Sequence, residues 1–362
     1  MKFPIKAISP LTIAVLAVLF AAVDTQATSL QNESGGVNNN VIYNDTHANS
    51  KFDRGAQQLS FTMGVIQTTP NYKDTHVNEP NLFPGNASVD THAKKFASTK
   101  PRLLTQVPYS ALGVLATSEQ DDQFSYGDDP LQTVYIWHGR GGDENEFAGD
   151  AVIFVHGGCW LNAYGFDHAK GFYHALAERG LGVYAMEYRR VGDDGGGWPG
   201  SLEDVIKAVR ASIVNIEATG GSGDIYLVGH SAGGHLGLLA AQALSESDVS
   251  KAIKKVIGLA AITNLQSYAL GENSCQTATP QFMGGMPSDD KRTYKLATPN
   301  VADITPPVIL LQGEEDSIVP KHHALVPGAR NRIIKNGGHF DWLHSESTSF
   351  DALLEVLSHH DK

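Results

Sequence analysis

The segment Gly229-His230-Ser231-Ala232-Gly233 stands between a short apolar run, 225–228, and a long helical pattern, 232–244. An apolar run followed at once by a helix predicts a strand, a tight turn and a helix. A serine at such a turn is held in a strained conformation, and the strand and helix approach so closely that only glycine fits two positions before and after it. The segment therefore predicts Ser231 as a nucleophile presented on a sharp turn.

The chain after about residue 124 alternates short apolar or β-branched runs with longer helical patterns. This alternation is typical of βα units around a mostly parallel sheet with helices on both faces, an α/β fold. The expected strands are 133–137, 151–155, 182–188, 224–228, 256–261, 307–311 and 332–335, and the expected helices are 171–179, 201–216, 232–244 and 348–357.

A second glycine-rich turn follows the expected strand 151–155, in the order His156-Gly157-Gly158-Cys159-Trp160. Glycines allow the main chain to approach a developing oxyanion with no Cβ in the way. We expect the N–H groups of Gly157 and Gly158, with that of Ala232 at the start of the next helix, to form an oxyanion hole. The alternative is an ordinary glycine-rich turn.

Candidates for the acid and the base lie after the serine. Asp316 follows the expected strand 307–311, and His339 lies in the glycine-flanked turn Gly337-Gly338-His339. The order Ser, Asp, His is the order of the α/β-hydrolases. The neighbouring acids Glu314, Glu315 and Asp341 remain alternatives to Asp316.

The other histidines have less specific surroundings. His230 and His235 flank the serine turn and are expected to pack beside it, and the pairs His322-His323 and His359-His360 are expected at the surface. No His-x-x-x-His or Cys-x-x-Cys pattern is present, so we predict no metal. A Ser-His-Asp hydrolase needs no cofactor.

Taken together, these motifs resemble the α/β-hydrolase superfamily, and within it the His-Gly-Gly-x-Trp group of kynurenine formamidases, hormone-sensitive-lipase-type carboxylesterases and feruloyl or acetylxylan esterases. The resemblance covers about residues 125–358 and includes Tyr126-Gly127, Tyr188-Arg189, Trp198-Pro199 with Asp204, and Ala297-Thr298-Pro299. Cys159 stands where hormone-sensitive-lipase relatives carry a third glycine. The resemblance implies the α/β-hydrolase fold and favours ester hydrolysis over formamide hydrolysis.

Substrate selection is expected from Trp160, Asn162 and Tyr164, and from the segment 263–303 between the sixth and seventh strands. This segment is longer than an ordinary connection, so we predict a lid or pocket wall. Cys275 lies in it and Cys159 lies in the oxyanion loop. A disulfide between the two is one prediction, and two free thiols are the alternative.

The beginning of the chain differs from the rest. Lys2 and Lys6 precede the apolar run 11–23, and small residues follow at 25 and 27, which predicts a secretory signal peptide over 1–27. The run is short for a membrane span, so an uncleaved anchor is the less favoured alternative. Residues 28–120 are polar and without periodicity, which predicts a loose extension before a catalytic domain at 121–362.

The charge constrains the partners. The 362 residues carry a formal net charge of −12, and the region 28–120 has seven charges of each sign, so the whole excess of acids lies in 121–362. Nucleic-acid binding is disfavoured because phosphate contacts need clustered basic side chains. Eight acids against Arg140 alone in 121–150 favour neutral or cationic substrates over polyanions.

The sequence therefore predicts an exported, periplasmic or extracellular serine hydrolase that cleaves a small-molecule carboxylic ester through an acyl-enzyme, with no stable membrane anchor. Three alternatives stay open: an arylformamidase, a prolyl-oligopeptidase-like peptidase, and a non-catalytic ligand-binding member of the fold. The oligomeric state and the acyl and alcohol groups are not specified by these motifs.

Overall fold

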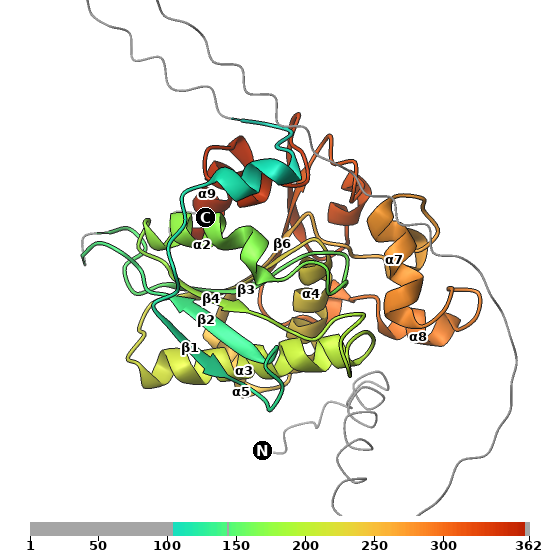
Figure 1. Cartoon of the computed structure of the whole chain (residues 1–362), viewed down its shortest axis with the longest axis horizontal. Coiled ribbons are helices and arrows are strands. Elements are labelled where there is room, and N and C mark those ends of the chain that lie inside the picture. Colours follow the sequence, from blue (N-terminus) through green and yellow to red (C-terminus); the bar gives the residue numbers. More distant parts are fainter. Residues whose placement is uncertain (1–103, 143–144, 359–362) are drawn as a thin grey trace, which may run out of the picture. The chain divides into compact units, whose positions relative to one another are not determined.

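An eight-stranded sheet runs through the described part of the chain, residues 104–142 and 145–358 of a computed structural model (Figure 1). Its strand order is β1-β2-β4-β3-β5-β6-β7-β8. The pairs β1–β2 and β2–β4 are antiparallel and all others are parallel, so the prediction of a mostly parallel sheet is confirmed. The strands are β1 (Asp122–Ser125), β2 (Thr133–Trp137), β3 (Ala151–Val155), β4 (Gly182–Met186), β5 (Ile225–His230), β6 (Ile253–Leu259), β7 (Val308–Gly313) and β8 (Arg330–Ile334).

Helices cover both faces because the central strands are apolar on both sides. In β3, Ile153 and Val155 belong to one buried cluster, and Val152 and Phe154 belong to the other. Successive side chains of a strand point to opposite faces, so one short apolar run supplies two cores. The first cluster includes side chains of α3 (Gly200–Ala218) and α4 (Ala232–Leu244), and the second those of α2 (Lys170–Ala177) and α9 (Thr348–Leu357).

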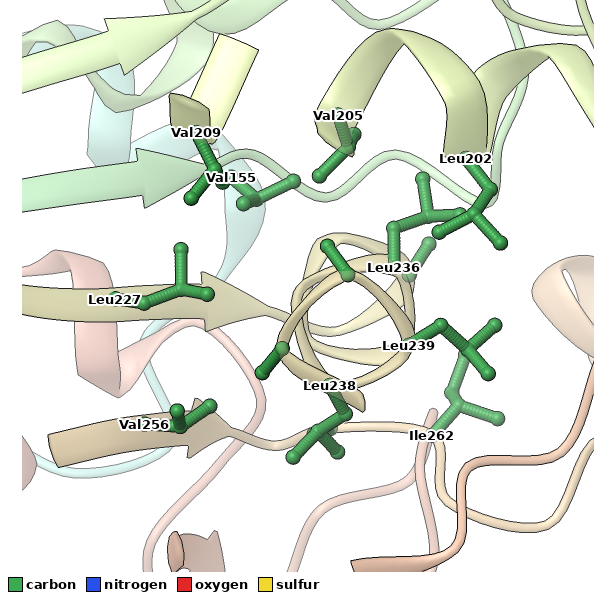
Figure 2. Close-up of a cluster of buried hydrophobic side chains, with 14 of the residues drawn as sticks. Val155, Leu202, Val205, Val209, Leu227, Leu236, Leu238, Leu239, Val256 and Ile262 are labelled. Atoms are coloured by element: carbon green, nitrogen blue, oxygen red, sulfur yellow. The ribbon is translucent and has the colours of Figure 1, made fainter. Parts of the chain in front are cut away.

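Helix α4 packs against the sheet at its centre (Figure 2). Leu236 and Leu239 of this helix are buried in the same cluster as Val155 of β3 and Leu227 of β5. Val205 of α3 also belongs to this cluster. This packing fixes the N-terminus of α4, and with it Ser231, relative to the ends of β3 and β5.

The region 263–303, predicted as a lid or pocket wall, contains regular structure that the sequence analysis did not predict. It forms three short α-helices, whose side chains Tyr268, Cys275, Phe282 and Tyr294 are buried in the first core cluster, and the 3₁₀ helix η3 (Val301–Asp303). Sequence periodicity missed these helices because each is only 4 to 10 residues long and one contains Pro280. The remaining α-helices of the described chain are α5 (Asp248–Ala252), α6 (Leu265–Tyr268), α7 (Ser274–Met283) and α8 (Lys291–Leu296).

Residues 104–120 belong to the same compact unit as the rest of the described chain. The 3₁₀ helix η1 (Tyr109–Val114) buries Leu112 in the core beside α2, and the N–H of Leu104 donates to the carbonyl of Glu346. The predicted signal peptide, residues 28–103 of the predicted extension, and His359-His360 lie outside the described residues. None of the helices that the structure describes is long and apolar enough to cross a membrane.

Candidate active site

Ser231 occupies a strained turn between β5 and α4. Its φ of 55° lies in the left-handed region, which is unfavourable for a residue with a Cβ. A Cβ on Gly229 would lie 2.5 Å from the carbonyl oxygen of Gly233, and a Cβ on Gly233 would lie 2.2 Å from that of His156. Backbone atoms cannot move away as a flexible side chain can, so both positions require glycine. This is the turn that the sequence predicts for a nucleophile.

His339 and Asp316 are hydrogen-bonded to each other. Nδ1 of His339 lies 2.7 Å from Oδ2 of Asp316, and both residues are buried. The other carboxylate oxygen, Oδ1, accepts from the N–H groups of Ile318 and Val319, each at 2.8 Å. A carboxylate with these partners is fixed in orientation and can hold the imidazole in one tautomer, with Nε2 free to accept a proton.

The alternative acids have other surroundings. Asp341 accepts from the N–H groups of Gln106, Val107 and Gly338, at 3.0, 2.7 and 2.8 Å, so it fastens the beginning of the described chain to the His339 turn. Glu315 is exposed, and Glu314 lies 3.8 Å from Lys321. Of the four acids, Asp316 is therefore the one placed to act on His339.

The main chain of His339 is held close to the serine turn. Nε2 of His230 donates to the carbonyl oxygen of His339 at 3.0 Å, and the two rings are 4.7 Å apart. Burial, reinforced by the neighbouring His339, holds the pKa of His230 well below its usual value, so this ring is neutral. Within the described residues the Ser231 hydroxyl has no hydrogen-bond partner. His230 thus packs beside the serine, as the sequence predicts.

The loop after β3 lies directly against Ser231. A Cβ on Gly157 would lie 3.0 Å from the carbonyl oxygen of His230 and 3.2 Å from Cβ of Ser231. The N–H groups of Gly157 and Gly158 donate to no acceptor in the described part of the chain. Ala232 is the first residue of α4, where an N–H has no acceptor within the helix. The structure therefore places Gly157 and Ala232 beside the serine, and Gly158 follows Gly157 in the same loop.

The structure contradicts the prediction that Trp160 lines the substrate pocket. Its side chain is fully buried, stacks on Phe282 at 4.9 Å and donates from Nε1 to Nδ1 of His235 at 3.3 Å. A side chain without exposed surface cannot contact a substrate, so Trp160 is a core residue and not a pocket wall. Nε2 of His235 donates in turn to the carbonyl of Ala297 at 2.6 Å.

The other two predicted pocket residues are exposed. The side-chain amide of Asn162 donates to Oδ1 of Asp193 at 3.0 Å. Asp193 lies in the connection between β4 and α3. Tyr164 lies next to Gly158, where an added Cβ would be 2.5 Å from Cβ of Tyr164. Its ring meets that of Tyr109 edge-on at 6.0 Å, and Tyr109 meets Phe340 at 5.3 Å. Tyr109 and Phe340 were missed by sequence analysis, since Tyr109 belongs to the polar stretch before the motifs.

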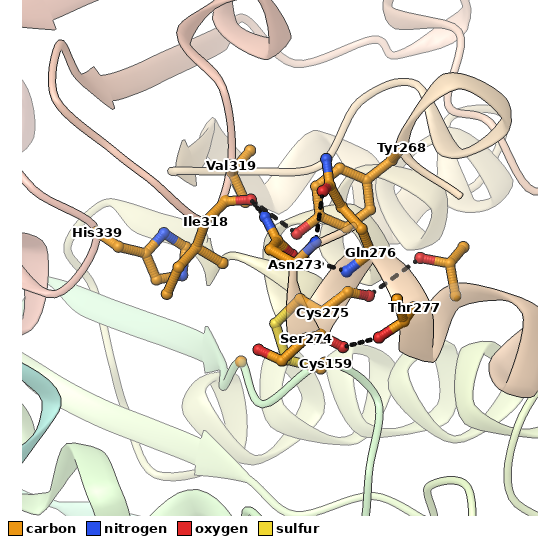
Figure 3. Close-up of a disulfide and its surroundings, with 12 residues drawn as sticks. Cys159, Tyr268, Asn273, Ser274, Cys275, Gln276, Thr277, Ile318, Val319 and His339 are labelled. Carbon is orange, nitrogen blue, oxygen red and sulfur yellow. Dashed lines mark hydrogen bonds between the residues drawn. A yellow bond between two sulfur atoms is a disulfide. The ribbon is translucent and has the colours of Figure 1, made fainter. Parts of the chain in front are cut away.

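Cys159 and Cys275 form a disulfide that joins the oxyanion loop to helix α7 (Figure 3). Asn273 caps this helix, and its Nδ2 donates to the carbonyl of Ile318 at 2.8 Å. The N–H of Ile318 is one of the two that hold Asp316. The region 263–303 is therefore attached both to the oxyanion loop and to the loop that carries the acid.

The prediction for His323 is also wrong. It was expected at the surface, but it is 1% exposed and its Nδ1 accepts from the N–H of Thr263 at 3.1 Å. Burial lowers its pKa to about 4. The preceding His322 is exposed. The sequence does not show which of the two histidines is buried, because they lie in a 3₁₀ helix of only four residues, Lys321–Ala324, which is too short to show a periodic pattern.

Gln312 is a further residue that the motifs did not indicate. Its Nε2 donates to Oδ2 of Asp316 at 3.0 Å and to the carbonyl of Val319 at 2.7 Å. The sequence signal that could have indicated Gln312 is a glutamine at the end of an otherwise apolar strand.

Among the described residues, no group of three or more His, Cys, Asp or Glu side chains is placed to hold a metal ion.

A serine at a strand–helix turn in a mostly parallel sheet, with an Asp-His pair from the loops after β7 and β8, defines an α/β-hydrolase. The BD-FAE family model matches residues 143–326, half of the chain, so the protein belongs to the BD-FAE family. It is a carboxylic ester hydrolase. No curated protein matches its sequence.

Solved structures with a similar fold include esterase B from Lactobacillus Rhamnosis (HN001), with 20% identity, a TM-score of 0.55, and coverage of 69% of this chain and 88% of that one. Another is a truncated carbohydrate esterase from gut microbiota, with 19% identity, a TM-score of 0.51, and coverage of 67% and 97%. At this identity the likeness shows the fold. The predicted α/β-hydrolase fold and the predicted ester hydrolase activity are both confirmed.

Proposed function

We propose that the protein is an exported serine esterase in which Ser231, His339 and Asp316 form a catalytic triad. The observation that carries the proposal is the 2.7 Å hydrogen bond between His339 and Asp316, on loops beside the Ser231 turn. His339 takes the hydroxyl proton as Ser231 attacks the ester carbonyl, and Asp316 stabilises the resulting imidazolium. His339 then gives the proton to the leaving alcohol, and water clears the acyl-enzyme by the same route.

The N–H groups of Gly157, Gly158 and Ala232 donate hydrogen bonds to the carbonyl oxygen on which the negative charge forms. One such donor typically stabilises the transition state by about 2.7 to 4 kcal/mol. The three groups belong to two loops that the packing of α4 and the contact of Gly157 with Ser231 keep together. They need little reorganisation when the charge develops.

The substrate we propose is a neutral ester with a small or aromatic group. Tyr109 and Tyr164 are 43% and 37% exposed and meet edge-on beside the oxyanion loop, and such rings give contact area at a low entropy cost. Structures of the fold include an esterase B inhibited by a tributyrin phosphonate and a carbohydrate esterase, so acylglycerols and acylated sugars belong in the assay panel.

Export is proposed from the predicted signal peptide and from the disulfide, since disulfides persist in oxidising compartments. N-terminal sequencing of the protein recovered outside the cytoplasm tests it. A mature chain that begins near residue 28 supports export, and recovery of Met1 contradicts cleavage.

The triad is tested with a fluorophosphonate probe and a panel of aryl esters, acetylated sugars, feruloyl esters and N-formylkynurenine. Ser231→Ala should abolish labelling and reduce hydrolysis by several orders of magnitude. Asp316→Asn should lower kcat by about 10⁴-fold because the imidazole takes the wrong tautomer. Asp341→Asn is the matched control, whose effect should fall on stability. Undiminished turnover by Ser231→Ala would refute the triad, and hydrolysis of N-formylkynurenine alone would favour a formamidase.

A further inference from the structure

His156, the first residue of the oxyanion loop, is fully buried and has an acceptor at each ring nitrogen. Nδ1 lies 2.7 Å from the carbonyl oxygen of Gly157, and Nε2 lies 2.9 Å from Oε1 of Glu187. A carbonyl oxygen can only accept, so Nδ1 carries a proton. The ring also stacks on Tyr188, with centroids 4.5 Å apart, and the Tyr188 hydroxyl donates to the His156 carbonyl at 2.9 Å. The imidazole is therefore fixed in position.

Glu187 is ionised, so Nε2 of His156 must donate as well. Oε1 of Glu187 also lies 2.9 Å from Nη1 of Arg190 and accepts from the N–H of Tyr188 at 3.0 Å, and Oε2 accepts from the N–H of Phe166 at 3.1 Å. Burial by itself would raise the pKa of the Glu187 carboxyl, but His156, Arg190 and the Tyr188 N–H together lower it. An ionised carboxylate is only an acceptor. Both nitrogens of His156 then bear protons, and the ring is an imidazolium.

The neighbouring histidine does not share this charge. His168 lies 5.9 Å from His156 between ring centroids, and burial, followed by repulsion from His156, lowers its pKa to about 4. Its Nδ1 donates to the carbonyl of Gly165 at 2.6 Å. Of this pair, only His156 is hydrogen-bonded to a carboxylate, since His168 bonds to a carbonyl.

The hydrogen bond to the Gly157 carbonyl reaches the oxyanion hole through one peptide group. The carbonyl of Gly157 and the N–H of Gly158 belong to the same amide, and a donor on the oxygen draws electron density from the nitrogen. Hydrogen bonds joined in this way strengthen each other by roughly 10 to 30% per bond in a low-dielectric interior. A charged donor is stronger than a neutral one. The Gly158 N–H should therefore become a better donor toward a developing oxyanion.

We propose that His156 is a positioning residue that, as an imidazolium held by Glu187, polarises the Gly157–Gly158 peptide and strengthens the Gly158 N–H as an oxyanion donor. The proposal deepens the proposed esterase function and rests on it for the role of the oxyanion hole. Arg190 supports the same unit, because its Nη1 also donates to the carbonyl of Tyr164 at 2.6 Å, at the far end of the loop.

The kinetic test compares three variants with the wild type on one aryl ester. His156→Leu removes the donor that both polarises the Gly157–Gly158 peptide and holds it in place, and should lower kcat by up to about 10²-fold, the effect of a misplaced catalytic group. His156→Asn places an amide donor near the position of Nδ1 and should recover about tenfold of this loss. Glu187→Gln removes the charge that favours the imidazolium and should lower kcat by about tenfold with KM within about twofold. His168→Asn, a change at a neutral and partly buried histidine nearby, is the matched control and should stay within about threefold.

The proposal is overturned if His156→Asn is as inactive as His156→Leu while both variants fold and retain the disulfide, because the ring would then act only by packing. It is also overturned if His156→Leu keeps kcat within about twofold of the wild type. Equal losses in kcat for Glu187→Gln and His168→Asn would likewise remove the role of the charge.

A second measurement does not depend on catalysis. NMR of the full protein labelled with ¹⁵N-histidine should show two ring N–H groups for His156 at pH 7, identified by their loss in His156→Asn. A single protonated nitrogen overturns the proposal. If Ser231→Ala stays active while His156 is doubly protonated, the triad has failed and the imidazolium stands. If Ser231→Ala is inactive and His156 carries one proton, the reverse holds.

Discussion

Nε2 of His230 donates a 3.0 Å hydrogen bond to the carbonyl oxygen of His339, so the residue before the serine holds the main chain of the proposed base. The residue is 2% exposed, and its neutral ring has no other hydrogen-bond partner within the described chain. The contact sets the distance between the Ser231 turn and the loop after β8. A base displaced by about 1 Å costs on the order of 10²-fold in rate.

His230→Leu should therefore lower kcat by about ten- to a hundredfold, because the His339 loop loses its anchor to the serine turn. His230→Gln offers an amide donor near the position of Nε2 and should keep kcat within about threefold of the wild type. Steady-state kinetics on one aryl ester measures both, with thermal unfolding as the check on folding. Equal activity of the two variants would show that the hydrogen bond does not position His339.

Gly233→Ala should prevent formation of the active turn, because the added Cβ would lie 2.2 Å from the carbonyl oxygens of Val155 and His156. Gly237→Ala, one turn later in α4, meets only Cγ2 of Val155, at 3.6 Å. It should raise the free energy of unfolding by up to about 1 kcal/mol through helix propensity. Fluorophosphonate labelling and urea unfolding of both variants make the comparison. Normal labelling of Gly233→Ala would contradict the close approach of strand and helix.

The sheet and the Ser231 turn could be predicted because local sequence dictates them. The run 151–155 is apolar at every position, as a strand buried on both faces must be, and the glycines at 229 and 233 follow from backbone contacts. Asp316 and His339 could be placed because each follows a strand, and strand ends meet at one edge of a parallel sheet.

The rest of the site depends on contacts between distant segments, which periodicity does not encode. The side chain of Trp160 combines a large apolar ring with one N–H donor. The residues next to it in the sequence do not show whether it faces a pocket or the core. Its burial depends on Phe282 in α7. Tyr109 lies more than 200 residues from Phe340 in the sequence, so their contact was not foreseeable. The roles of His156 and Glu187 likewise depend on the pairing of β3 with β4.

Loss of the Cys159–Cys275 disulfide should lower the free energy of unfolding by about 4 to 5 kcal/mol, because the bridge closes a loop with a sequence separation of 116 residues. It should also slow fluorophosphonate labelling of Ser231, since the bridge holds the oxyanion loop against α7. The double variant Cys159→Ser, Cys275→Ser is measured by urea unfolding and labelling rate, and the wild type treated with a reductant serves as comparison. An unchanged unfolding midpoint would show that packing alone secures α7.

Acid should destabilise the folded domain partly through His235, which is neutral in the folded state. Nδ1 accepts from Nε1 of Trp160 and Nε2 donates to the carbonyl of Ala297, so an added proton on Nδ1 would break the contact with Trp160. Burial, only partly opposed by the Ala297 hydrogen bond, lowers the pKa of His235 to about 4. In the unfolded chain the pKa is about 6.5.

Below pH 6.5 the unfolded chain therefore binds a proton that the folded chain does not. The contribution of His235 to stability is complete above about pH 6.5 and is lost as the pH falls toward 4, at up to about 1.4 kcal/mol per pH unit. His323, with its pKa also near 4, adds a similar slope. Urea unfolding at pH 7.5, 6.0 and 5.0 should show the decline. His235→Gln keeps a donor for Ala297 and cannot titrate, so its stability should fall less steeply, and an equal slope in the two proteins would assign the decline to other groups.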